Sequence, residues 1–208
     1  MAVLFPTAIL ATRMQSPTTD DLAHAYRLIG FLKTQVYGGF TLRGDSKTQL
    51  EVYVDASHSI HSDSRGHGCL IACMAGCPIA WRSYKLNHVC LSSTESEISA
   101  VSEAITYIIW LRELFRELGR EQVGATPVYQ DNMSAVMIME KGGTFKRTKH
   151  IMNRFHFVME HVSAGMICFK RCATDIHVAD LLTKVQPAAR LEMLMRLISW
   201  SIVAPEGV

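Results

Sequence analysis

Two glutamates lie two positions apart in the stretch LSSTESEISAV, residues 91–101. Ser92 followed three residues later by Glu95 is typical of a capping box at the start of a helix. Helical spacing from Glu97 follows an apolar stripe, whereas spacing from Glu95 runs through serines and a threonine. That stripe is Val101, Ala104, Ile108, Leu111 and Phe115. We therefore expect Glu97 on the buried face of the helix, where a carboxylate needs a cation or hydrogen-bond donors.

Three aspartates elsewhere in the chain are further candidates for a carboxylate site. Asp55 lies near the end of the segment LEVYVDA, Asp131 ends TPVYQD, and Asp180 lies in VADLLTK. Each has an ordinary interpretation when it is taken singly: a turn residue at a strand end, a helix N-cap, and a charge at a helix start. Glu97 alone could equally be a misjudged surface residue. Only the fold can decide whether these acids form one site.

The elements that must position the acids follow from hydrophobic periodicity. Alternation predicts a strand in LEVYVDA and two more in HGCLIACMAG and CPIAWRSYK, joined by a turn at Gly76. Short apolar runs predict strands in TPVYQD and MICFKRC. Helical spacing predicts helices over 20–36, 92–118, 132–140 and the segment after RTKH, and others that begin at VADLLTK and PAARLEML. The first helix should bury Leu22, Ala25, Leu28, Ile29 and Leu32.

This order of elements predicts an α/β fold. A strand that crosses through a helix to another strand implies a parallel pair, here the first and fourth strands. The fold class is then a mixed five-stranded sheet, with three antiparallel and two parallel strands and helices on both faces. The chain reverses direction between strands one and four, and ligands favour such switch points at the carboxyl ends of strands. We expect Asp55 and Asp131 to flank that crevice, with Glu97 and Asp180 delivered to it by helix starts.

Converging carboxylates repel one another by several kcal/mol unless cations neutralise them. Oxygen ligands from few residues favour Mg²⁺, with Mn²⁺ as a substitute. Two such ions about 4 Å apart can activate water and stabilise the leaving oxygen of a phosphodiester. The sequence therefore predicts Asp55, Glu97, Asp131 and Asp180 as both metal ligands and catalytic residues.

Composition sets wider limits on function. The chain has 208 residues, of which 49% are hydrophobic, and a formal net charge of +2, so a disordered chain is not expected. Residues 141–159 nevertheless hold five Lys or Arg and no acid, which indicates a local basic segment. None of the six cysteines forms a Cys-x-x-Cys pair, so we expect reduced thiols and an intracellular protein, cytoplasmic, within virus-like particles or nuclear. Neither a signal peptide nor a membrane span is expected.

Several segments, in this order and at these intervals, resemble a known family: VYVDAS, IAWRSYK, LSSTESEISAVSEA, WLRELFRELG, VYQDNMSAV, RTKHIMNRFHFV and HVADLLTK. They are similar to the ribonuclease H domain of copia-type LTR retrotransposon Pol polyproteins. The stretch ILATRMQSPTTDDLAHAYRLIGFLKTQ is similar to the end of the reverse transcriptase that precedes this domain. The resemblance divides the chain into a reverse-transcriptase remnant (1–45), a ribonuclease H domain (46–187) and a C-terminal helix and tail (188–208).

The resemblance implies a ribonuclease H-like fold and an enzyme that cuts the RNA strand of RNA–DNA hybrids with two Mg²⁺ ions. The family's metal-binding carboxylates fall on Asp55, Glu97, Asp131 and Asp180. Partners would be the hybrid and the rest of a reverse transcriptase polyprotein, with no membrane. No polymerase activity is expected from this chain. The chain departs from the family at positions 57 and 58, at SRGHG and at Met152, none of which is a ligand.

Contacts to a hybrid would come from basic and hydrogen-bonding residues near the last helices. The candidates are Asn132, Ser134, Lys146, Arg147, Lys149, His150 and Arg154. A solvated helix face and ordinary helix capping are the alternatives for them. His177, three residues before Asp180, is a candidate auxiliary residue for proton transfer or product release. Trp81 and Trp110 are expected in the core.

Two further functions remain open. Drift around an intact set of acids is also what a catalytically inactive or domesticated nucleic-acid-binding remnant would show. A hydrolase that uses cysteine and histidine has little support, because no cysteine and histidine share a recognisable motif. A hybrid-cleavage assay with Mg²⁺ separates the nuclease from the silent remnant.

Overall fold

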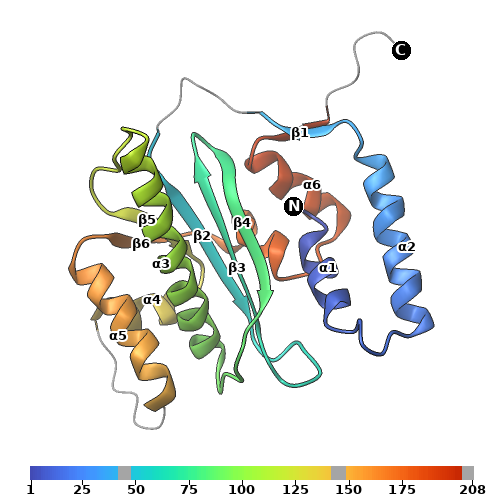
Figure 1. Ribbon diagram of the computed structural model, residues 1–208, viewed down its shortest axis with the longest axis horizontal. Coiled ribbons are helices and arrows are strands. Elements are labelled where there is room, and N and C mark those ends of the chain that lie inside the picture. The colour runs from blue at the N-terminus through green and yellow to red at the C-terminus, as the bar shows by residue number, and fades with distance from the viewer. Residues whose placement is uncertain (42–47, 142–148, 203–208) are drawn as a thin grey trace.

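A mixed sheet forms the centre of the structure, a computed structural model that describes residues 1–41, 48–141 and 149–202 (Figure 1). Its strands are β2 (Glu51–Ser57), β3 (His67–Met74), β4 (Cys77–Lys85), β5 (Thr126–Gln130) and β6 (Ile167–Arg171). They lie in the order β4-β3-β2-β5-β6, antiparallel from β4 to β2 and parallel from β2 to β6. The expected fold class, strand order and turn at Gly76 are confirmed, with the switch of direction between β2 and β5.

One face of the sheet is covered by α3 (Ser93–Glu117), α4 (Met133–Lys141) and α5 (Lys149–Ser163) (Figure 1). The Ser92 hydroxyl accepts the Glu95 amide and so caps α3, and Gly119, with φ of 69°, follows its end. The Glu95 carboxylate accepts the Leu91 amide. Alternate strand residues, including Val52, Val54, Leu70 and Ala72, pack here in one core with the predicted apolar stripe of α3 and with the apolar face of α5.

The other face is covered by α1 (Leu4–Ala11), the 3₁₀ segments η1 (Thr174–Ile176) and η2 (Val178–Leu182), and α6 (Ala188–Leu197). Cys69, Ile71 and Cys73 of β3 pack here with residues of η2 and α6. The expectation of an α-helix at VADLLTK is wrong, because the chain forms a short 3₁₀ segment there. All five residues of η2 are buried. An α-helix with only one face against the core would not bury five consecutive residues.

The terminal segments meet beside this second face (Figure 1). β1 (Gly38–Phe40) pairs with β7 (Trp200–Ile202) as an antiparallel two-stranded sheet. Neither α1 nor β7 follows from the sequence patterns above, since both are short and depend on tertiary contacts. In the described residues, no helix is long and apolar enough to cross a membrane. All six cysteines are free thiols, as expected.

The helix expected over 20–36 is α2 (Thr19–Thr34), which Thr18 and Asp21 begin as a capping box. Its predicted apolar stripe is not buried, which corrects the expectation from periodicity. Leu22, Ile29 and Leu32 are 55%, 48% and 50% exposed. The helix lies beside α1 at the side of the molecule, away from the central sheet (Figure 1).

Candidate active site

Asp55 and Asp131 come together because their strands share a register. Parallel pairing joins Tyr53 of β2 to Tyr129 of β5. Asp55 lies two residues after Tyr53 within β2, and Asp131 lies two residues after Tyr129, directly after the end of β5. Side chains two residues apart point to the same face, and neighbouring strands lie about 4.8 Å apart. The two tyrosine rings are stacked, with centroids 4.6 Å apart. The two carboxylates therefore lie side by side where β2 and β5 separate, as the sequence predicts.

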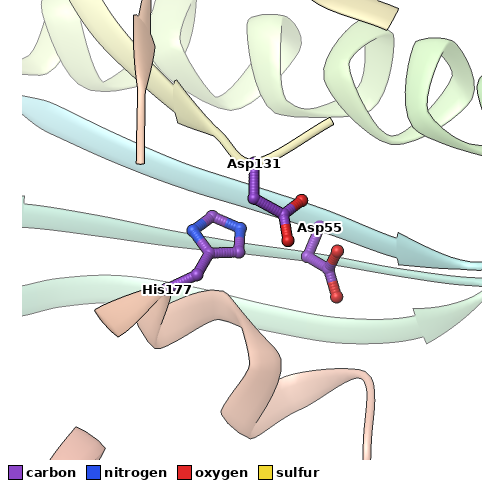
Figure 2. Close-up of side chains that lie close together, drawn as sticks. All are labelled: Asp55, Asp131 and His177. Carbon is purple, nitrogen blue, oxygen red and sulfur yellow. The ribbon is translucent and has the colours of Figure 1, made fainter. Parts of the chain in front are cut away.

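His177, the residue directly before η2, completes this cluster (Figure 2). One ligand atom from each of Asp55, Asp131 and His177 lies within 4.8 Å of the others. His177 is fully buried, and its Nε2 lies 3.0 Å from the Val54 carbonyl oxygen. Because a carbonyl can only accept, Nε2 carries the proton and holds the ring in place. The histidine proposed from the sequence is therefore fixed by the β2 backbone in this structure, which differs from a freely moving proton carrier.

Glu97 is buried at the start of α3 with a neutral partner. The Gln130 amide donates to Glu97 Oε2 at 2.8 Å, and Glu97 is 4% exposed. Burial, and then the carboxylates of Asp55 and Asp131, raise the pKa of Glu97 well above its ordinary value, while the Gln130 hydrogen bond opposes this shift. Within the described residues, Glu97 forms no ion pair. This is the environment expected of a carboxylate that an added cation would stabilise.

Asp180 is equally buried but has cationic partners. Its Oδ1 lies 2.7 Å from the Lys184 ammonium and its Oδ2 lies 2.6 Å from Arg190 Nη2. Burial raises the pKa of Asp180 and the Lys184 hydrogen bond opposes the increase. The same ammonium is 3.2 Å from Asp55 Oδ2, which also accepts the Thr183 hydroxyl. Burial lowers the pKa of Lys184, but Asp55 and Asp180 outweigh it and raise the pKa above its ordinary value.

The structure thus brings the predicted acids to one end of the sheet, where β2 and β5 separate. The Lys184 ammonium bridges Asp55 and Asp180, and the charges of Asp55 and Asp131 help to raise the pKa of Glu97. Their oxygen donors fit hard divalent cations such as Mg²⁺. The bridging ammonium of Lys184 is an independent indication that positive charge is favourable between these carboxylates. The residues present therefore fit a divalent metal site.

The predicted substrate contacts are only partly described. Lys146 and Arg147 lie outside the described residues, as do the side chains of Lys149 and His150. Asn132 Oδ1 accepts the Ala135 amide at 3.1 Å, which is the capping role that was the alternative for it. Ser134 is exposed on α4.

Arg154 lies beside two basic residues that the sequence did not single out. It lines a hollow of about 80 Å³ with Arg82 and Lys85 at the end of β4, together with Asn87, His88, Ser99 and Glu103 among others. Arg82 also lies over the Tyr84 ring, 4.5 Å from its centroid. The hollow is at the carboxyl end of β4, which antiparallel pairing puts at the same end of the sheet as Asp55. Arg82 pairs with Leu70, next to the Cys69 partner of Asp55, so it points to the opposite face of the sheet.

Other functional partners also escaped the sequence patterns. Lys184 lies four residues after Asp180, a helical acid–base spacing that could have indicated it. Gln130 and Arg190 carry no such signal, because only the fold brings them to Glu97 and Asp180. The expectation that Trp81 and Trp110 lie in the core is wrong, since they are 39% and 56% exposed.

Comparison with known proteins gives Pol polyproteins of transposons among the relatives of this chain. No protein-family model matches the chain. The "Retrovirus-related Pol polyprotein from transposon TNT 1-94" of Nicotiana tabacum is 34% identical over 157 residues, which are 74% of this chain and 12% of that protein. The corresponding polyprotein from transposon RE1 of Arabidopsis thaliana is 28% identical over 179 residues, which are 84% of this chain and 12% of that protein. The chain thus spans 12% of the length of either relative.

A solved structure shares the fold. The LC11-RNase H1 in complex with an RNA/DNA hybrid aligns with a TM-score of 0.50 and 12% sequence identity, over 64% of this chain and 93% of that one. This likeness is one of fold, with the same mixed sheet and helices on both faces.

Proposed function

We propose that this chain, a homologue of the Pol polyproteins of plant and yeast transposons with the fold of ribonuclease H, hydrolyses the RNA strand of RNA–DNA hybrids. The observation that carries the proposal is the adjacent pair Asp55 and Asp131 at the switch point of the sheet, with Glu97 and Asp180 buried beside them. Buried like charges are unfavourable without a cation, so this grouping is better explained by function than by stability.

The four acids would hold two divalent cations, with Mg²⁺ favoured by their oxygen donors. When bound, such ions supply an activated water and stabilise the leaving oxygen. The protein's own residues position these ligands. The Thr183 hydroxyl orients Asp55, the Gln130 amide orients Glu97, and Arg190 orients Asp180. His177 fixes the β2 backbone at Val54, one residue before Asp55, which supports an auxiliary role in positioning.

Basic side chains at the same end of the sheet as the acids would hold the nucleic-acid backbone. Arg154, with Arg82 and Lys85, is placed for phosphate contacts, and the predicted Lys146, Arg147, Lys149 and His150 adjoin it in sequence. Asn132 and Ser134 lie one and three residues after Asp131. The Asn132 side-chain NH2, whose Oδ1 caps α4, and the exposed Ser134 hydroxyl are proposed to sense the 2′-hydroxyl groups that distinguish RNA from DNA. Binding should then weaken strongly as salt concentration rises.

The transposon relatives suggest a wider setting. We propose that the chain acts in reverse transcription as part of a longer polyprotein, with residues 1–45 as the end of the reverse transcriptase, 46–187 as the nuclease domain and 188–208 as a C-terminal extension. An intracellular location remains a prediction from the reduced cysteines.

The test is cleavage of an end-labelled RNA–DNA hybrid in Mg²⁺. Asp55→Asn and Asp131→Asn should each reduce the rate by about 100-fold or more while hybrid binding persists, because the charge that holds the cations is lost. Asp20→Asn, the same change at an exposed residue of α2, is the matched control and should cleave at the wild-type rate. Equal rates in all the proteins would reject the site. Binding without cleavage by the wild type would instead support the catalytically silent remnant.

A further inference from the structure

We propose that Lys184 is a resident cation of the carboxylate site, which holds Asp55 and Asp180 together in the metal-free chain and is displaced when a divalent cation binds. The inference rests on the proposed function, because it requires that the acids bind metal. It adds a residue that sets how tightly, and how selectively, the site takes its cation.

The ammonium has the position and the partners of a bound cation. It lies 3.2 Å from Asp55 Oδ2 and 2.7 Å from Asp180 Oδ1, so it bridges two carboxylates that come from different elements. Both acids are buried, at 2% and 3% side-chain exposure. The bridge therefore lies between two buried like charges that would otherwise repel each other.

The acids are anchored independently of the lysine. Asp55 also accepts the Thr183 hydroxyl, and Asp180 also pairs with Arg190 at 2.6 Å. The Lys184 side chain, in contrast, is 42% exposed. Its stem is long and flexible, and water can solvate the ammonium once it leaves. Displacement can thus move the ammonium outward while both carboxylates keep their places.

This exchange favours divalent over monovalent ions. A monovalent ion would replace one unit charge by another, without a net electrostatic gain and with the loss of two short ion pairs. A divalent ion adds charge to a site whose carboxylates exceed the single ammonium. The loss of these two partly exposed ion pairs should weaken metal binding by about tenfold, which corresponds to about 1.4 kcal/mol.

The direct test is calorimetric titration of the full chain with Mn²⁺. Lys184→Gln removes the competing charge and should bind Mn²⁺ about tenfold more tightly than the wild type. Lys184→Arg keeps the charge and should bind within about twofold of the wild type by the same reasoning. Lys33→Gln, a change at an exposed lysine of α2, controls for the loss of one positive charge at a distance. Unchanged or weaker binding by Lys184→Gln would overturn the inference, since a merely structural lysine predicts a weaker site.

Amine labelling gives a second readout that does not depend on variants. Mass spectrometry after treatment with an amine-reactive reagent should show Lys184 protected in EDTA and more reactive in saturating Mn²⁺, with Lys33 equally reactive in both. Equal labelling of Lys184 in the two conditions would show that the ammonium is not displaced. These results are separable from the proposed function: a wild type that binds no Mn²⁺ contradicts the metal site itself, whereas binding with no release of Lys184 contradicts only the exchange.

Discussion

The α3 side and the η2 side of the carboxylate site present the same kind of acid in different electrostatic settings. Glu97, on α3, is buried beside a neutral amide from Gln130. Asp180, on η2, is equally buried but is paired with Lys184 and Arg190. The difference shows that burial alone does not determine what a carboxylate does for the fold. Glu97 is a source of repulsion until a cation arrives, whereas the charge of Asp180 is already partly compensated by Lys184 and Arg190.

The difference predicts that removal of the two charges has opposite effects on stability. Glu97→Gln and Asp180→Asn should each reduce hybrid cleavage by about 100-fold or more, because each removes a proposed metal ligand. In EDTA, however, Glu97→Gln should stabilise the chain by about 1 kcal/mol, or about 2–4 °C in Tm, since it relieves buried repulsion and keeps the Gln130 contact.

Asp180→Asn should instead destabilise the chain by about 1–2 kcal/mol, because it leaves Lys184 and Arg190 with less compensation, discounted for their partial exposure. Thermal melts and cleavage assays on the same protein preparations measure both quantities. Stability changes of the same sign in the two variants would remove the contrast between the two sides of the site.

A smaller effect should appear in the pH dependence of stability without metal. The pKa of Glu97 is raised by burial and by Asp55, so above its ordinary value of 4.5 the native chain binds more protons than the unfolded chain. The stabilisation from protonated Glu97 is therefore present at low pH and is lost as pH rises through the folded pKa. Melts in EDTA from about pH 5 to about pH 8 should show a steeper fall in stability for wild type than for Glu97→Gln.

The comparison with the variant isolates Glu97 from groups of opposite sign. Burial lowers the pKa of His67 to about 4, whereas the ordinary value is 6.5. The neutral, buried histidine therefore makes the folded chain less stable as the pH falls below 6.5. His67 is present in both proteins, and its contribution cancels in the difference between them. Parallel pH profiles for wild type and Glu97→Gln would mean that Glu97 has no raised pKa.

Much of the fold could be predicted because its central elements have regular patterns. The alternation in LEVYVDA and the stripe that starts at Glu97 both predict their buried faces correctly. The errors lie where burial depends on contacts from distant segments. Ser99 and Ser102, on the polar spacing from Glu95, are buried as well, and their hydroxyls are satisfied by donating to carbonyls of the same helix. The apolar stripe of α2 is the opposite case: its spacing predicts a buried face, but the helix does not pack that face against the core and the stripe is exposed.

The candidate site likewise contains residues that the sequence predicts and residues that it does not. The placement of Asp55 beside Asp131 follows from strand order and register, both of which the sequence indicates. The counter-charges of Lys184 and Arg190 and the amide of Gln130 could not be predicted from spacing alone, because they depend on how η2 and α6 pack against the sheet end. Sequence therefore predicts the acids better than it predicts what compensates them.

The most direct test of the metal site is anomalous diffraction from crystals of the chain grown with Mn²⁺. The gathered carboxylates predict an anomalous difference peak in contact with both Asp55 and Asp131, with the Lys184 ammonium no longer between Asp55 and Asp180. The absence of a peak at these aspartates, in crystals where Mn²⁺ occupies other positions, would contradict the claim that the acids are gathered to hold a divalent cation.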